Sequence, residues 1–235
     1  MKTMKSWMFA AILLCGTGMN AQAQDSDYYD TKDEVAFSIG SGTNSQILDV
    51  FTDLFGVMGE ALVTSVVTGG TYTGTTSYDN KSTIPAFSIE YFHHLNKVIS
   101  IGAVGAFNGY SKDMYVVWQR NDGSSKASKE DIGYAKKYYI SLMPAVKFDW
   151  LRKENFGLYS KIAIGATYMY EKEVQEKDDS GNEIGEKEVH SESKWMGNFQ
   201  ASLLGIEAGS QKLRGFAEFG FGEQGIVLVG ARYKF

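Results

Sequence analysis

Two adjacent histidines, His93 and His94, are the side chains of this chain best suited to proton transfer or metal binding. They end a segment in which apolar and polar residues alternate, as in a β-strand. Neighbouring residues of a strand point to opposite sides, so one metal ion cannot easily take both imidazoles. We therefore expect two polar side chains at a strand end, and neither a metal site nor a catalytic pair.

Charged residues at alternate positions form a second group that could take part in chemistry. In strands they would share the face opposite the apolar one. The six that we assign to this polar face are Glu90, Lys147, Asp149, Lys161, Glu218 and Arg232. A charge in a low-dielectric interior must be paired, and Glu218 and Arg232 lie on segments joined by a short turn, so we expect them to pair. The pattern favours salt bridges that fill and stiffen an interior over an ion path gated by rearranged pairs.

Eight segments carry this alternation and would hold those side chains as strands. They cover residues 34–40, 84–92, 98–110, 137–150, 156–171, 195–207, 215–222 and 226–235. The last segment places aromatic residues on its apolar side up to the chain end, at Tyr233 and Phe235. Aromatic residues make up 14% of the chain, which contains only 2 prolines, and this composition suits strands rather than disorder. The sequence predicts an all-β fold.

The connections between these segments alternate in length. Those near Asn96, Arg152 and Lys212 are short, whereas 41–83, 111–136 and 172–194 are long; the last connection, at Gln224, is short again. Short turns on one rim and long loops on the other are typical of an outer-membrane barrel, and a soluble sandwich has no reason to sort its loops in this way. We expect an eight-stranded antiparallel up-and-down transmembrane β-barrel, whose narrow bore is filled by side chains.

The beginning of the chain resembles a secretory signal peptide. Lys2 and Lys5 precede a short apolar run, and Ala21-Gln22-Ala23 supplies a cleavage site. We expect residues 1–23 to be removed and 24–235 to form the barrel domain. A lipoprotein signal at Cys15 is the weaker alternative, because Leu14 is not a small residue. If Cys15 leaves with the signal, no thiol chemistry remains. No later segment has 18 consecutive apolar residues, so we expect no transmembrane helix.

Several stretches are similar to the small eight-stranded outer-membrane β-barrel proteins of Bacteroidota-type bacteria. They are residues 143–156 with the following Leu158-Tyr159-Ser160, residues 204–207, and residues 215–222 before the final strand. The resemblance covers roughly residues 83–235 and implies a fold and a location in the outer membrane. It also implies that Tyr233 and Phe235 act as the signal that the barrel-assembly machinery reads. It does not imply one activity, which must be argued from a site.

The first long connection has an unusual apolar stripe. Ser45 is a candidate helix cap, and apolar residues follow at helical spacing. The candidate interaction face of this expected amphipathic helix comprises Phe51, Leu54, Phe55 and Met58. Such a helix would cover the barrel mouth, lie on the membrane surface, or bind an external partner.

The acidic connection 172–194 contains Asp178-Asp179-Ser180-Gly181-Asn182-Glu183, which lacks the ligand spacing of a calcium loop and is expected to be a solvated tip. Asn121-Asp122-Gly123 is a turn signal. The formal charge of −5, without a basic cluster, argues against nucleic acid as a partner.

We therefore expect a monomeric outer-membrane protein in contact with lipid, without a cofactor, in a structural or surface-interaction role. A narrow gated channel is the first alternative. A lipid-modifying enzyme is a weaker one, because His93 and His94 fall beside a short turn, on the rim away from outer-leaflet lipids.

Overall fold

The computed structural model describes residues 31–123, 128–176 and 187–235. The expected signal peptide, 1–23, and the acidic stretch 178–183 lie outside these residues. The described part contains eight strands and one helix, α2 (Asn44–Val67). The strands are β1 (Asp33–Ser41), β2 (Tyr72–His94), β3 (Ile99–Arg120), β4 (Ser128–Arg152), β5 (Phe156–Glu176), β6 (Lys187–Gly209), β7 (Leu213–Gly222) and β8 (Val227–Lys234).

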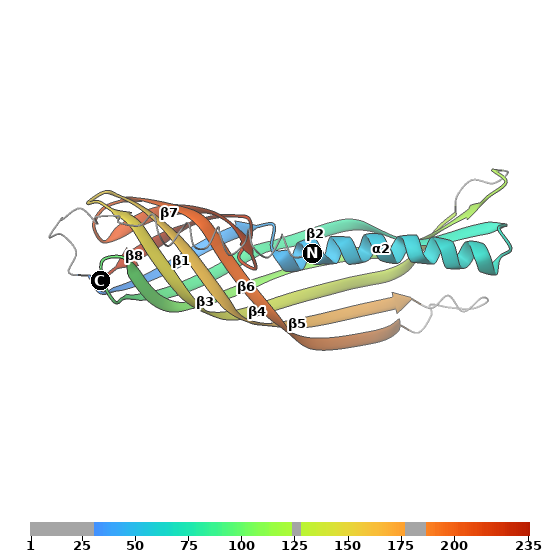
Figure 1. Ribbon diagram of the computed structural model, residues 1–235. Helices are drawn as coiled ribbons and strands as arrows, with labels where there is room; N and C mark the ends of the chain where they lie inside the picture. Colours follow the sequence, from blue (N-terminus) through green and yellow to red (C-terminus); the bar gives the residue numbers. More distant parts are fainter. Residues whose placement is uncertain (1–30, 124–127, 177–186) are drawn as a thin grey trace, which may run out of the picture.

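The strands form a single antiparallel sheet that closes on itself (Figure 1). Each strand pairs with the next one along the chain, and β1 also pairs with β8, from Glu34 opposite Lys234 to Ser41 opposite Val227. The chain end belongs to this closure, because the backbone N–H groups of Asp33 and Phe235 each donate to the other residue's carbonyl oxygen, at 3.0 and 2.8 Å. The expected all-β fold of eight antiparallel strands is confirmed.

Period-two alternation decides which side chains lie inside the closed sheet. In β7, buried and exposed residues alternate without a break, and Glu218 is buried whereas Phe219 is exposed. The apolar part of the interior forms two small clusters, one around Phe92 and Met143 and the other around Tyr110 and Tyr139. Most of the remaining interior is polar, which reverses the arrangement of a water-soluble β-sheet protein.

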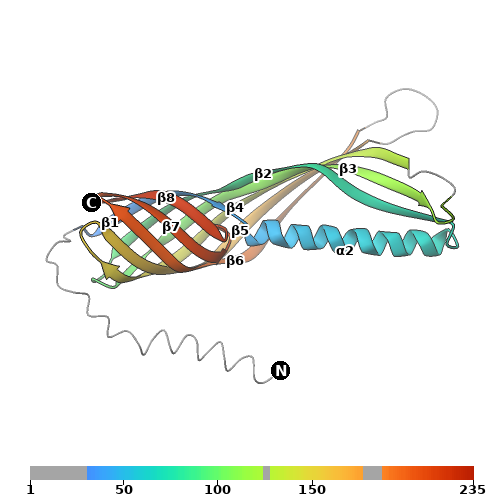
Figure 2. The same ribbon diagram turned by 90° about the horizontal axis from the view of Figure 1, so that it is seen from above.

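Short turns gather at one end of the closed sheet, which we call the turn end. The connections between β2 and β3, β4 and β5, and β6 and β7 lie there, as does the chain end (Figure 2). At the opposite end, the mouth, β1, β7 and β8 stop, whereas β2 to β6 continue well beyond it. The expectation of long loops was therefore wrong for much of 72–83, 111–120, 128–136 and 187–194, because strand pairing continues through these residues.

α2 begins at the mouth and projects away from it along the direction of the closed sheet (Figures 1 and 2). Its N-cap is Thr43, whose side chain accepts from the backbone N–H of Gln46 at 3.2 Å. The expected cap, Ser45, lies one position inside the helix, because Thr43 has the extended backbone that a cap requires. The expected helix is confirmed, but it does not fold over the mouth.

α2 is long and apolar enough to cross a membrane: it has 24 residues, with a mean hydropathy of 1.5 over its most apolar window. This agrees with the absence of an unbroken run of 18 apolar residues, because Asp49, Asp53 and Glu60 each interrupt the apolar sequence of α2. That the chain has no transmembrane helix stays a prediction.

Candidate functional site

Ten charged side chains fill the closed sheet and form what we call the bore cluster. The five carboxylates and five cations are each buried and each lie within 4.0 Å of an opposite charge. All six charged residues that the sequence assigned to the polar face are present. The bore cluster comprises Glu34, Glu90, Asp149, Glu207, Glu218, Lys147, Lys161, Arg214, Arg232 and Lys234.

Arg232 joins four carboxylates from four different strands. Its Nη1 donates to Glu207 at 2.7 Å, and its guanidinium lies 3.4 Å from Glu34, 3.6 Å from Glu90 and 3.9 Å from Glu218. The expected pair of Glu218 with Arg232 is thus the longest of the four contacts. Chain neighbours in a closed sheet are not the nearest charges, because inward side chains also meet across the bore.

Lys161 is the closer partner of Glu218. Its Nζ lies 2.9 Å from Glu218 Oε2 and also donates to Glu90. The hydroxyl of Tyr159 donates to the other oxygen of Glu218 at 2.8 Å, and Ser202 donates as well. Lys161 exposes none of its surface, so this ion pair lies in a low-dielectric interior and would be costly to break.

The turn end of the bore is closed by a second group around Glu207. Glu207 accepts from Arg214 at 2.7 Å and from Lys234, in addition to Arg232. Arg214 also donates to the backbone carbonyl oxygens of Lys153 and Glu154 at 2.9 and 2.8 Å. These bonds attach the bore cluster to the backbone of a short turn, so the cluster fixes the rim as well as the wall.

His94 and Ser100 face each other inside the bore at the turn end. Ser100 Oγ lies 2.5 Å from His94 Nδ1, and His94 Nε2 lies 3.3 Å from Glu34. This Ser–His–acid set was not expected from the sequence. Ser100 exposes none of its surface, and a carboxylate oxygen of Asp149 lies 3.7 Å from His94 Nδ1, the nitrogen that Ser100 contacts. The geometry therefore leaves no approach for a substrate to the hydroxyl of Ser100.

His93 lies on the outer side, where its Nδ1 is 2.9 Å from a carboxylate oxygen of Asp33. The two histidines therefore point to opposite faces, as the alternation predicts. Within residues 31–123, 128–176 and 187–235, no three histidine, cysteine or acidic side chains are arranged to hold a metal ion.

The mouth is occupied by Glu223, which links the closed sheet to α2. Its Oε2 accepts from the hydroxyl of Ser45 at 2.6 Å, and its Oε1 accepts from the side-chain amide of Asn108 at 2.8 Å. Glu223 is fully buried. The first turn of α2 is therefore held by polar contacts inside the mouth, and these contacts fix the direction in which the helix leaves.

Each acidic residue of α2 continues this polar path along the extended strands. Asp49 accepts from Tyr139 and, at 3.2 Å, from Lys137. Burial lowers the pKa of Lys137, but the carboxylates of Asp49 and Glu171 outweigh it and raise the pKa above its usual value. The ammonium group of Lys137 therefore stays charged beside the helix.

Farther out, Lys112 donates to Asp53 and lies over the ring of Tyr78, 3.7 Å from its centre. Burial, with Asp53 and Glu60, raises the pKa of Tyr78 to about 12, so its phenol remains neutral. Glu60 accepts from the backbone N–H of Thr76 at 2.8 Å. All three charges of the helix are thus bound on the side that faces the strands.

The opposite side of α2 is apolar and exposed. The four residues of the candidate interaction face, Phe51, Leu54, Phe55 and Met58, are between 52% and 67% exposed. Leu48, Leu62, Val63 and Val66 extend the same apolar surface along the helix.

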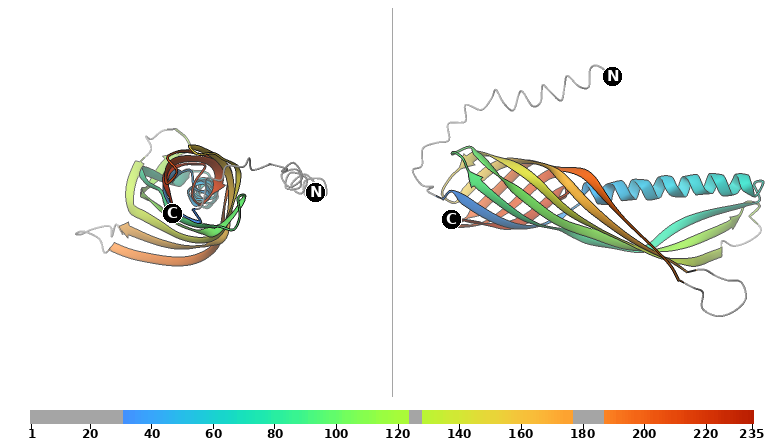
Figure 3. Two further views of the ribbon diagram at one scale, coloured as in Figure 1. Left: turned by 90° about the vertical axis from the view of Figure 1, so that its left-hand side faces the viewer. Right: turned by 90° about the horizontal axis from the view of Figure 1, so that it is seen from below.

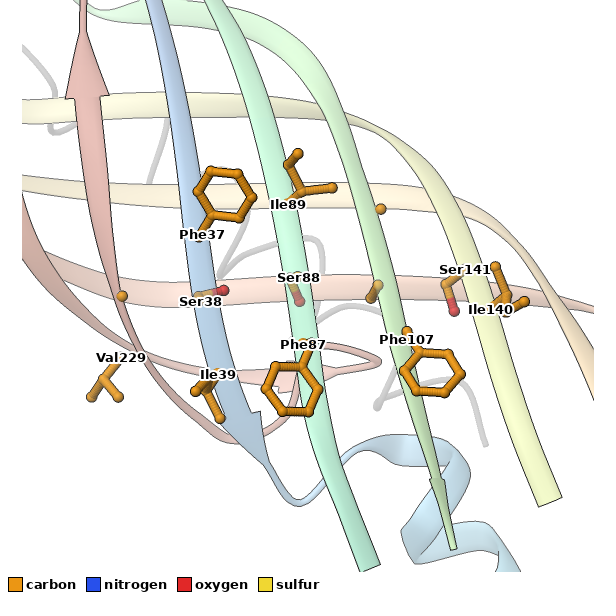
Figure 4. A pocket seen from close by; sticks show the side chains of 13 residues that line it. Phe37, Ser38, Ile39, Phe87, Ser88, Ile89, Phe107, Ile140, Ser141 and Val229 are labelled. Carbon is orange, nitrogen blue, oxygen red and sulfur yellow. The ribbon is translucent and has the colours of Figure 1, made fainter. Parts of the chain in front are cut away.

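A shallow groove of about 620 Å³ lies on the outer wall of the closed sheet and not in its bore. Figure 4 shows apolar side chains of β1, β2, β3, β4 and β8 around it, with Phe37, Phe87 and Phe107 prominent. Gly105 contributes no side chain to the wall, and this leaves room between its neighbours. Three serines, Ser38, Ser88 and Ser141, also line the groove, but they are buried, and most of its lining is apolar. The groove therefore suits a hydrocarbon chain better than a polar ligand.

Tyr233 and Phe235, assigned from the sequence to the chain-end signal, lie on the outer wall at the turn end. Their rings stack with centres 6.0 Å apart, and both are about half exposed. They add an aromatic edge to the apolar outer surface.

No protein-family model matches the chain, and comparison with curated proteins finds no match.

Proposed function

We propose that this protein is an integral protein of a bacterial outer membrane, with a filled interior and a structural or surface-interaction role. The observation that carries this proposal is the reversed distribution of side chains. Ten charges lie inside the closed sheet, while residues such as Ile162, Ile164 and Leu142 stand outward and more than half exposed. In water this arrangement would be unfavourable twice, because the charges lose their hydration and the apolar side chains are exposed to solvent. In lipid the exposed apolar side chains become favourable.

The height of the apolar wall supports the same proposal. On β5 the outward positions from Leu158 to Tyr168 are apolar except Ser160, whose hydroxyl donates to the backbone carbonyl oxygen of Leu203 at 2.7 Å. About ten residues at ~3.3 Å each, tilted by ~40°, span about 25 Å, the height of the apolar band in such barrels. Aromatic side chains border this band: Tyr168 packs on Trp195 toward the mouth, and Tyr233 stacks on Phe235 at the turn end. Aromatic girdles at both membrane interfaces are typical of these proteins.

The orientation follows from the connections. Short turns face the periplasm in outer-membrane barrels, so the mouth, the extended strands and α2 would lie outside the cell. The proposed role is then to stabilise the envelope or to present this external part to a partner. The resemblance to Bacteroidota-type barrels, and recognition of Tyr233 and Phe235 by the assembly machinery, belong to the same proposal.

A filled bore is favoured over an ion channel because the bore cluster contains equal numbers of carboxylates and cations, cross-linked through Arg232 and Lys161. An ion path would have to separate several of these buried pairs at once, and each separation is costly. A catalytic role gains no support from His94, because the hydroxyl of Ser100 beside it is enclosed. We therefore propose a non-catalytic protein.

Membrane fractionation with heat-modifiable gel migration tests the proposal. We expect the protein in the outer-membrane fraction, running as a compact species without heating and at its full mass after boiling. Recovery as a soluble periplasmic protein would overturn the proposal. A steady conductance of nanosiemens size in planar bilayers would leave the location intact but refute the filled bore.

A further inference from the structure

The charged residues of α2 lie on one side of the helix, and an exposed apolar stripe that takes no part in its attachment lies on the other. All its charged side chains are bound to the strands or their backbone, as described above. The opposite side carries the stripe Leu48, Phe51, Phe55, Met58 and Leu62, which we call the arm face. These five residues are between 53% and 69% exposed, and none of them is charged. A surface of this kind is expected to be covered by another apolar surface.

The chemistry of α2 argues against a lipid surface as the cover. Helices that lie on membranes usually carry lysine and arginine on their polar side, and α2 has neither residue. Its long axis also continues the axis of the closed sheet, so it stands away from the membrane instead of lying on it (Figure 3). A small ligand is also a poor fit, because the arm face is a convex helix surface and ligand sites are concave.

The spacing of the arm face points to another helix. Its residues follow each other at intervals of three, four, three and four, which is the repeat that lets two helices interlock their side chains. A second copy of the chain supplies the same uncharged stripe, so pairing of like faces brings no charge repulsion.

The exposed area is sufficient for such pairing. If a large apolar side chain exposes roughly 100 Å² when about 60% exposed, the arm face and its apolar neighbours offer ~800 Å², the size of one side of a standard interface. Burying both faces would therefore reach the range of specific protein–protein contacts.

The position of α2 decides how two copies can meet. In the end view the helix lies within the outline of the closed sheet (Figure 3). Eight tilted strands with outward side chains make a body ~25 Å across, whereas packed helices lie roughly 8–10 Å apart. Two neighbours in one membrane therefore cannot bring their helices together while both stand upright. Two copies in facing membranes can, because each helix reaches ~36 Å beyond its own mouth.

We propose that the arm face of one molecule packs antiparallel against the arm face of a second copy held in a facing membrane, so that the protein joins two membrane surfaces. This inference rests on the proposed function, because it requires the closed sheet to span a membrane. Antiparallel pairing centred on Phe55 places Phe55 opposite itself and Leu48 opposite Leu62. The geometry therefore predicts which positions meet and which do not.

Disulfide trapping in vesicles tests this pairing. The full chain, with Cys15→Ser to remove its single cysteine, is reconstituted in phosphatidylcholine vesicles and oxidised. Phe55→Cys should cross-link to itself, and Leu48→Cys should cross-link only when its vesicles are mixed with Leu62→Cys vesicles. Self-cross-linking of Leu48→Cys would indicate parallel helices in one membrane and overturn the proposal, as would the absence of any cross-link above that of an outer-wall control, Leu203→Cys.

Vesicle aggregation measured by turbidity gives the second readout. We expect wild-type vesicles to aggregate and the pair Phe51→Ser with Phe55→Ser to slow this at least about tenfold, the effect of ~1.4 kcal/mol. A matched control, Val50→Ser with Val67→Ser, changes two exposed apolar residues of α2 off the arm face and should retain aggregation. Binding of protein-bearing vesicles to empty vesicles would assign the arm face to lipid and overturn the proposal.

Heat-modifiable migration is measured on every variant. Variants that keep the compact form but lose aggregation support the pairing. If the wild-type protein fails to insert into vesicles, the membrane proposal fails by itself, and cross-linking of Phe55→Cys in detergent then decides separately whether α2 pairs.

Discussion

Replacing Lys161 by methionine tests whether the bore cluster is dry. Methionine keeps much of the side-chain volume but removes the charge between Glu90 and Glu218. Glu90 then keeps the amide of Gln224 at 2.7 Å, and Glu218 keeps two hydroxyl donors. Among the described residues, Arg232 is then the cation that remains within 4.0 Å of these carboxylates, at 3.6 Å from Glu90 and 3.9 Å from Glu218.

Removing one partner of a buried pair typically lowers the free energy of unfolding by about 3–5 kcal/mol. Because Glu90 and Glu218 keep other hydrogen bonds, we expect a loss of ~3 kcal/mol for Lys161→Met. In urea unfolding of the detergent-solubilised protein this corresponds to a fall in the midpoint of roughly 1–2 M. The double variant Lys161→Met with Glu218→Gln removes both charges, and we expect it to recover most of the loss.

The reasoning is refuted if Lys161→Met costs less than ~1 kcal/mol, because that is the range of a solvent-screened surface pair. It is also refuted if the double variant is as unstable as the single one. Either result would mean that water enters the bore, which would favour the gated channel.

Three further perturbations test other parts of the structure. Gly40→Ala should prevent folding, because the added Cβ would lie 1.9 Å from a backbone carbonyl oxygen in the turn before β8. The control Gly215→Ala, whose Cβ would have no atom nearer than 3.9 Å, should leave the folded fraction unchanged. Equal folded yields for the two variants would contradict the geometry at the mouth. Phe235→Ala should reduce the amount assembled in the outer membrane more than it changes the stability of the assembled protein, and normal outer-membrane levels would refute its role as a signal. Glu223→Gln should weaken the bond to Ser45 by about 1–2 kcal/mol and speed amide hydrogen exchange in the first turns of α2, with β1 to β8 unaffected; unchanged exchange in α2 would show that Glu223 does not hold it.

The period of two predicts the closed part of the sheet well, because one face of each strand is apolar and the other is not. Residues such as Ile162 and Ala163 alternate between the outer wall and the bore in both sequence and structure. The strand extensions could not be found in this way. Beyond Tyr110, β3 continues as Ser111-Lys112-Asp113, where polar residues occur on both faces, and the alternation disappears although the pairing continues.

Six of the ten residues of the bore cluster were predicted from the sequence, and the alternation would have identified others. Lys234 is two residues from Arg232, and Glu34 is two residues from the inward Ala36, so the alternation itself assigns both to the bore. The individual pairs were not accessible, because contacts across a closed sheet depend on how its strands are staggered. The contact of His94 with Ser100 did leave a signal, since a tight turn centred near Lys97 places these two residues opposite each other.

The central claim, that the outer wall lies in lipid, is tested most directly by a depth profile along β5. Nitroxide labels are attached to single cysteines at the outward positions Leu158, Ile162, Ile164 and Tyr168 of the Cys15→Ser protein in phosphatidylcholine vesicles, and collision rates with oxygen and a water-soluble nickel complex are measured. We predict that oxygen accessibility peaks at Ile162 and Ile164, and that nickel accessibility rises toward Leu158 and Tyr168. Uniformly high nickel accessibility at all four positions would contradict the membrane-spanning barrel.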